Sequence, residues 1–116
     1  MNPYDLANQL ADALSMHPDI QRLKQLKMRI RNQQAAKEMM DDFFEKQKAL
    51  AAMYEAGHTP TPTQISEIRH LAQVLGGHPL CKEYIDLEIK IAGLITEIQQ
   101  IIGEPLRIAT WYSEIQ

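Results

Sequence analysis

Two offset heptad stripes of apolar residues run through residues 80–102 and predict one helix with a wide apolar face. The first stripe consists of Leu80, Tyr84, Leu87, Ile91, Leu94, Ile98 and Ile101, and the second of Cys81, Ile85, Glu88, Ala92, Ile95, Gln99 and Ile102. At about 1.5 Å per residue this helix is roughly 35 Å long, more than a chain of 116 residues usually spans. We therefore expect part of it to pack against a second chain.

Apolar spacings of three and four residues predict three helices before residue 58. The first opens at Asn2-Pro3 and ends near Met16, and His17-Pro18 breaks the chain so that the second starts at Pro18. Asn32 is the expected cap of a long third helix that ends at Gly57. The expected buried positions are Leu23, Leu26 and Ile30 in the second helix, and Ala36, Met40, Phe43, Gln47, Leu50 and Tyr54 in the third.

Proline and glycine residues mark the expected helix ends and loops in the rest of the chain. The stretch 58–62 contains two prolines and is expected to form a loop, after which Thr63 opens a short fourth helix that Gly76-Gly77 stops. His78-Pro79 then starts the fifth helix, which we expect Gly103 and Pro105 to end. Both histidines before proline, His17 and His78, are expected to cap backbone N–H groups or to be exposed.

These elements predict an all-α fold of about five helices, two of them long, in an antiparallel helical bundle without a sheet. We expect residues 1–106 to form a single helical domain and residues 107–116 to form a C-terminal tail. We expect a homodimer whose seam lies on the two long helices and comprises Phe43, Gln47, Leu50, Tyr54, Leu87, Ile91, Leu94 and Ile98. The polar residues Gln47 and Glu88 interrupt these stripes, where they either fix the register or place their polar ends in water at the rim.

Composition narrows the functional classes. One cysteine, Cys81, excludes an intrachain disulfide framework and fits a reducing compartment, where a buried small hydrophobic role is favoured over a reactive thiol. The first thirty residues contain three aspartates and do not resemble a secretory signal, and charges interrupt residues 80–102, so we expect a cytoplasmic protein without membrane insertion. No nucleophile–histidine–acid spacing or glycine-rich phosphate loop is present, which argues against an enzyme.

The second helix concentrates positive charge, although the whole chain has a formal charge of -3. Its basic residues are Arg22, Lys24, Lys27, Arg29 and Arg31, against the single acid Asp19. At about 100° per residue, Lys24, Lys27 and Arg31 share one flank of the buried stripe, and Arg22 and Arg29 share the other. Helix 18–31 is therefore a candidate patch for RNA phosphates or an acidic partner, and the alternative is a solvated cationic face.

Glu67-Ile-Arg-His70 has the spacing by which one helix offers two ligands to a di-iron carboxylate centre. Such a centre needs a second copy of the motif, which only a homodimer would supply, and further inward-facing glutamates. Solvated helix residues are the simpler interpretation. We expect no cofactor, and a metalloprotein with a dimer-shared site remains an alternative.

Several stretches resemble the YlbF/YmcA family. They are Tyr4-Asp5-x-Ala7-x-x-Leu10-x-x-Ala13-Leu14, Asp42-Phe43-x-x-x-Gln47, Gly57 before the proline loop, Glu88, and the closing Ile101-Ile102-x-x-Pro105-Leu106, an ending most similar to the YheA-like branch. The resemblance covers residues 4–106 and is carried by packing positions.

The resemblance implies a small helical bacterial cytosolic protein that self-associates. The better-studied relatives are non-catalytic subunits of a complex that acts with the membrane-anchored endoribonuclease Y in mRNA processing, and so influence competence, sporulation and biofilm formation. Those relatives are also linked to iron–sulfur clusters through cysteines, whereas here residues 106–116 contain none and Cys81 stands alone. No active-site residue is implied. The leading interpretation is a helical adaptor or regulatory protein. The alternatives are an RNA-binding protein that uses the basic helix 18–31 and a helical metalloprotein with a dimer-shared site at Glu67 and His70.

Overall fold

The computed structural model describes residues 1–111, and that part of the chain contains five helices and no strand. The helices are α1 (Pro3–Ser15), α2 (Pro18–Arg31), α3 (Gln34–Glu55), α4 (Pro62–Gly76) and α5 (Pro79–Ala109). The predicted all-α class and the two long helices are confirmed. Of the predicted tail, residues 112–116 lie outside the described residues.

Polar side chains start the helices that the sequence placed after a cap and a proline. The Asn2 side chain accepts a hydrogen bond from the Asp5 N–H at 2.9 Å. His17 Nδ1 accepts from the Asp19 N–H at 3.1 Å, and His78 Nδ1 accepts from the Cys81 N–H at 3.5 Å. The predicted capping by both histidines is confirmed, since each imidazole satisfies a backbone donor that the first helical turn leaves unpaired.

Two predicted helix starts were wrong by one or two residues. Asn32 is not the cap of α3 but ends α2 in an αR conformation, so that the turn contains one more residue and Gln33 precedes α3. The cap of α4 is Thr61 rather than Thr63, because Thr61 and Gln64 form a reciprocal capping box with bonds of 2.8 and 3.2 Å. Pro62 consequently occupies the first turn of α4, where its missing N–H costs nothing.

The predicted end of the fifth helix was also wrong. α5 continues through Gly103 and Pro105 to Ala109, with Thr110 closing its last turn by donating its N–H to the Leu106 carbonyl at 2.9 Å. A proline inside a helix removes one hydrogen bond, but this stretch is solvent-exposed and water can satisfy the freed carbonyl. α5 therefore extends the apolar face by about two turns beyond the predicted stop.

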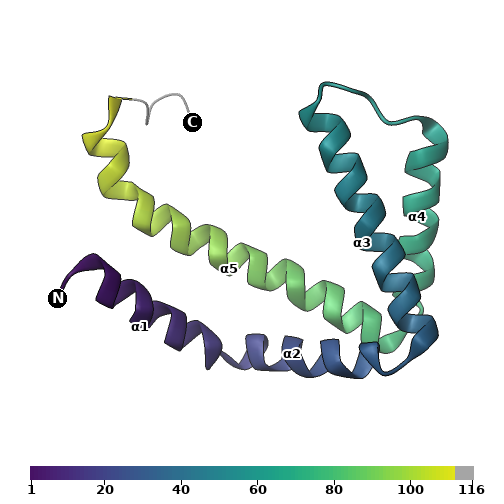
Figure 1. The fold of residues 1–116 in the computed structure, drawn as a ribbon, viewed down its shortest axis with the longest axis horizontal. Coiled ribbons are helices and arrows are strands. Elements are labelled where there is room, and N and C mark those ends of the chain that lie inside the picture. The colour runs from purple at the N-terminus through teal and green to yellow at the C-terminus, as the bar shows by residue number, and fades with distance from the viewer. Residues whose placement is uncertain (112–116) are drawn as a thin grey trace.

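The five helices form two arms that diverge from one vertex (Figure 1). The long arm consists of α5 with α2 packed antiparallel along its first half and α1 continuing the line of α2, and the short arm is the antiparallel pair α3 and α4. The radius of gyration is 18.2 Å, and the molecule measures 47 × 37 × 16 Å. A compact domain of this length has a radius of gyration of about 13 Å, so the chain is flat and open.

The hydrophobic core lies at the vertex, where α2 ends, α3 begins, α4 ends and α5 begins. Its buried members are Ile30, Ala36, Met40, Phe43, Leu75 and Cys81. Away from the vertex the arms are thinly covered: α1 contains no buried residue, and Cys81 is the one buried residue of the 31 in α5. Within residues 1–111, no helix is both long and apolar enough to span a membrane.

Candidate functional site

The predicted basic patch on α2 divides into two flanks, as the helical period indicated. On one flank, the Arg22 guanidinium binds the Glu83 carboxylate of α5 through two hydrogen bonds of 2.7 and 2.8 Å. This bond holds the pKa of Glu83 below its ordinary value, with Arg29 adding a smaller electrostatic contribution. The same contact raises the pKa of Arg22. Arg22 therefore joins α2 to α5 and contributes little to a free cationic surface.

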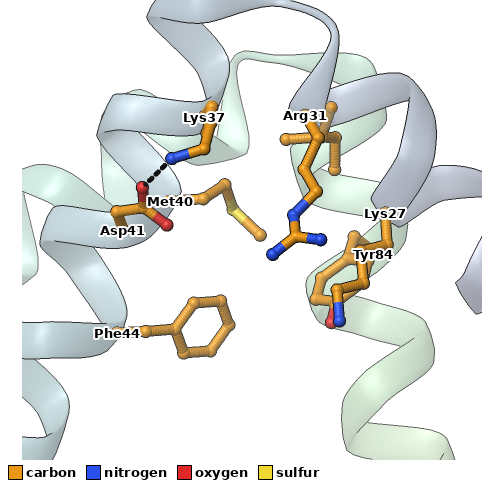
Figure 2. A pocket seen from close by; sticks show the side chains of 8 residues that line it. Lys27, Arg31, Lys37, Met40, Asp41, Phe44 and Tyr84 are labelled. Atoms are coloured by element: carbon orange, nitrogen blue, oxygen red, sulfur yellow. Dashed lines mark hydrogen bonds and ion pairs between the residues drawn. The ribbon is translucent and has the colours of Figure 1, made fainter.

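The other flank opens onto a cavity of about 150 Å³ between α2, α3 and α5 (Figure 2). Lys27 and Arg31 line it from α2, and Lys37 and Asp41 line it from α3. Lys24, the remaining member of the predicted patch, is exposed and does not line the cavity. Two of the five predicted basic residues thus converge on one site, together with a third cation, Lys37, which lies on α3 and outside the predicted patch.

The apolar wall of this cavity comes from three helices: Ile30 of α2, Met40 and Phe44 of α3, and Tyr84 of α5. The Phe44 and Tyr84 rings meet edge to face with centroids 6.4 Å apart. Burial raises the pKa of the Tyr84 phenol, and the neighbouring Glu88 carboxylate raises it further, so the hydroxyl stays protonated at neutral pH. The cavity combines apolar walls with cations, which suits a ligand that carries both an apolar and an anionic group.

Sequence reasoning missed Lys37, Phe44 and Tyr84 as neighbours of the basic helix. One local signal was available: the break at residues 32–33 is too short to separate the last turn of α2 from the first turn of α3, so cations on those turns lie close together. The approach of Tyr84 depends on how α5 docks at the vertex, and no local pattern reports that.

The predicted seam residues occupy both arms. On α3, Phe43 is buried in the core, Leu50 is half-buried, Gln47 is exposed and Tyr54 is 64% exposed. On α5, the remaining four are half-buried: Leu87, Ile91, Leu94 and Ile98. Because the arms diverge, the far ends of α3 and α5 lie apart within one chain (Figure 1). Gln47 keeps its polar end in water, which agrees with the rim interpretation.

Glu67 and His70 lie one turn apart on the exposed face of α4, in a shallow depression that they share with Pro62, Thr63 and Ser66. Among residues 1–111, no three histidine, cysteine, aspartate or glutamate side chains are grouped so as to hold a metal ion. Within one subunit the motif therefore offers two ligands, which is fewer than a stable site needs.

Cys81 is fully buried at the vertex, as the hydrophobic interpretation predicted. Burial raises the pKa of its thiol, although the residue lies in the first turn of α5, where a helix dipole favours a thiolate. Desolvation raises the thiol pKa by more than the helix dipole lowers it, because the surrounding side chains are apolar. The thiol stays protonated near neutral pH and acts as core packing.

Residues 4–107 match the family model described as "Control of competence regulator ComK, YlbF/YmcA". Among curated relatives, a UPF0342 protein of Streptococcus mutans is 32% identical over 92% of this chain and 95% of its own length. A UPF0342 protein of Caldicellulosiruptor bescii is 30% identical over 90% of this chain and 88% of its own length.

Two solved structures share the fold. A protein of unknown function (DUF964) from Bacillus stearothermophilus has a TM-score of 0.80 at 24% identity, over 89% of this chain and 90% of that chain. The structure of yheA from Bacillus subtilis has a TM-score of 0.69 at 24% identity, over 95% of this chain and 100% of that chain. The open arrangement of five helices therefore recurs among similar proteins.

Proposed function

The chain belongs to the YlbF/YmcA family, and we propose that it is a non-catalytic helical adaptor that regulates other proteins by binding them. The family is described by its control of the competence regulator ComK, which is a regulatory role. The fold supports an adaptor because it offers long surfaces on two arms, while the core of the described residues is confined to the vertex.

One observation carries this proposal: the chain exposes far more surface than a compact monomer of its size. Its accessible surface is 9043 Å² for a mass of 13.3 kDa. A compact monomer of that mass exposes about 6,400 Å², so the excess is roughly 40%. Stable interfaces bury about 800 Å² on each partner, and this excess is large enough for one self-association interface and a second surface for a partner.

We propose that the first of these interfaces joins two copies of the chain along the seam on α3 and α5. The seam is continued on α5 by Ile101, Ile102 and Leu106, which are 73%, 56% and 58% exposed. Contiguous exposed apolar side chains on one helix are typical of protein contacts, because leaving them in water costs free energy that association recovers.

Glutamate substitutions in the seam test self-association. We expect Ile91→Glu/Ile98→Glu to reduce the molar mass measured by light scattering from that of a dimer to that of a monomer, because each change places a charge in a desolvated contact. Ile101→Glu should do the same without disturbing the monomer, since this side chain is 73% exposed in one chain.

Ile89→Glu is the matched control. Ile89 is 68% exposed on α5 but lies about 160° around the helix from Ile91, so its substitution should leave the mass unchanged. Circular dichroism of each variant shows whether the helices persist. A wild-type chain that is monomeric at micromolar concentration, or an Ile101→Glu variant that keeps the dimer mass, would contradict the proposed seam.

We propose further that the partner is the RNA-processing complex containing endoribonuclease Y, as the family resemblance implies. This proposal is supported by family membership and by the surface that remains after self-association. Purified chain mixed with the soluble part of endoribonuclease Y from the same organism, together with the other family members of that organism, should elute as one complex in size-exclusion chromatography. Separate elution of all components at concentrations of tens of micromolar would count against this partner.

A further inference from the structure

We propose that the cavity between α2, α3 and α5 binds a short acidic and hydrophobic segment of a partner protein. In this arrangement one apolar side chain of the segment enters the cavity, and a neighbouring carboxylate binds Lys27 and Arg31 at the rim. The inference rests on the proposed adaptor function and adds the chemistry that the partner must present.

The size of the cavity sets the size of the occupant. Pockets for drug-sized ligands and cofactors usually measure about 300–1,000 Å³, whereas this cavity measures about 150 Å³. An apolar cavity of about 150 Å³ in another protein is large enough for benzene. The cavity therefore accommodates one leucine-sized or phenylalanine-sized side chain and excludes a nucleotide with its sugar.

The walls of the cavity fit an apolar side chain. Met40 and Phe44 come from successive turns of α3, and Tyr84 faces them from α5 (Figure 2). Methionine adapts its shape to irregular neighbours, and the edge-to-face pair of Phe44 and Tyr84 leaves ring surface for a further apolar contact. The Tyr84 hydroxyl is engaged with the Glu88 carboxylate, so the aromatic ring is the part of Tyr84 that faces an incoming apolar side chain.

The rim of the cavity fits a carboxylate. Asp41 already binds Lys37 at 2.7 Å, so these two charges compensate each other. Among the described residues, neither Lys27 nor Arg31 forms an ion pair, and Figure 2 shows the Arg31 guanidinium directed into the space beside Met40, Phe44 and Tyr84. A planar guanidinium binds a carboxylate through two parallel hydrogen bonds, which orients the occupant as well as attracting it.

The same features favour a protein segment over RNA. RNA-binding surfaces stack splayed bases on exposed aromatic faces and track the phosphates with a continuous cationic groove. Here the aromatic pair is half-buried, Arg22 is engaged with Glu83, and the Asp41 carboxylate stands at the rim. The net charge of -3 gives no long-range attraction to a polyanion.

A library of random peptides displayed on phage, selected against the full chain, tests the proposal. We expect the selected sequences to carry an aspartate or glutamate within two positions of a leucine, isoleucine, methionine or phenylalanine. The synthetic form of a selected peptide should bind Lys27→Gln/Arg31→Gln at least about ten-fold more weakly than the wild-type chain, and its affinity for the wild-type chain should fall as salt is raised.

Lys24→Gln/Lys48→Gln is the matched control, because it removes two positive charges from exposed positions on α2 and α3 that do not line the cavity. Its peptide affinity should stay within two-fold of the wild type. Both variants change exposed or rim side chains, so circular dichroism should show unchanged helicity.

Three results would overturn the inference: no acidic and hydrophobic enrichment in the library, equal weakening by both double variants, or binding only of an oligouridylate or inorganic phosphate that depends on Lys27 and Arg31. Light scattering on the same samples separates this inference from the adaptor proposal. A dimer that binds no such peptide removes the cavity assignment alone, whereas a wild-type monomer removes the seam even where peptides bind.

Discussion

At the scale of single residues, two glycines near helix ends differ only in backbone conformation. Gly57 follows α3 with φ of +77°, in the left-handed region that side chains with a Cβ disfavour. Gly76 is the last residue of α4, in a helical conformation. A Cβ built on either glycine meets no atom within 4 Å, so space does not distinguish them. The effect of an alanine substitution on the stability of the protein therefore depends on the backbone conformation at each position.

We expect Gly57→Ala to lower the free energy of unfolding by about 1 kcal/mol, because alanine must adopt the left-handed conformation. Gly76→Ala, the matched control, should raise it by about 0.5–1 kcal/mol, because alanine loses less conformational entropy than glycine in a helix. Urea denaturation at one fixed protein concentration measures both. Equal effects of the same sign would contradict the assignment of Gly57 to a left-handed turn.

Residues whose role depends on nearby sequence were predicted well. The left-handed Gly57, the capping by His17 and His78, and the burial of Cys81 follow from local chemistry, and the structure contains all four. The start of α4 was misplaced because the stretch 59–63 contains three threonines, each of which could cap a helix. The choice between them depended on Gln64 reaching back to the Thr61 N–H at 2.8 Å, a reciprocal bond that outweighs the looser spacing of Thr63 and Glu67.

At the scale of helices, charge pairs align α2 with α5. Arg22 binds Glu83, and Asp19 binds Lys90 at 3.0 Å. The earlier residue of α2 thus pairs with the later residue of α5. This is the order expected of antiparallel neighbours. Leu26 also lies on α2, and its side chain is fully buried. The charge pairs set the register of a contact whose stability comes mainly from apolar burial.

The Glu83 carboxylate makes this contact sensitive to acid. Its pKa in the folded chain is lower than its ordinary value of 4.5, chiefly because of the hydrogen bonds from Arg22. A depressed pKa contributes stability that is fully present above the unfolded value and is lost as the pH falls through the folded value. We therefore expect Glu83→Gln to destabilise the chain at pH 7 and to match the wild type once both are measured below the folded pKa.

Denaturant titrations at pH 7 and at pH values from 5 to 3 measure this effect, which should be small because the pair is exposed to solvent. One molar salt should reduce the difference at pH 7. Glu97→Gln is the control on the same helix, since among the described residues Glu97 forms no ion pair. An equal loss of stability in both variants, or a Glu83→Gln effect that persists in acid, would contradict the role given to Arg22 and Glu83.

At the scale of the whole molecule, residues 1–111 form one small core and two arms that this core does not cover. A single vertex of buried side chains joins four helix ends, while α1 has no buried residue and α5 has one. About one further turn of α5 beyond Pro105 lengthens the uncovered arm. A monomer with this ratio of surface to core is marginally stable, so self-association should raise the free energy of unfolding as the chain concentration increases.

The sequence by itself determined the helices, their order, their apolar stripes and the family, because periodicity, capping and proline placement act over one or two turns. It also divided the basic residues of α2 into the two flanks that the structure contains, since the helical period alone sets that division. Only the tertiary structure decided that the arms diverge, and that Lys37, Phe44 and Tyr84 join Arg31 around one cavity. These features depend on the angle at which helices distant in sequence dock at the vertex, and that angle is chosen by the packing of many side chains at once.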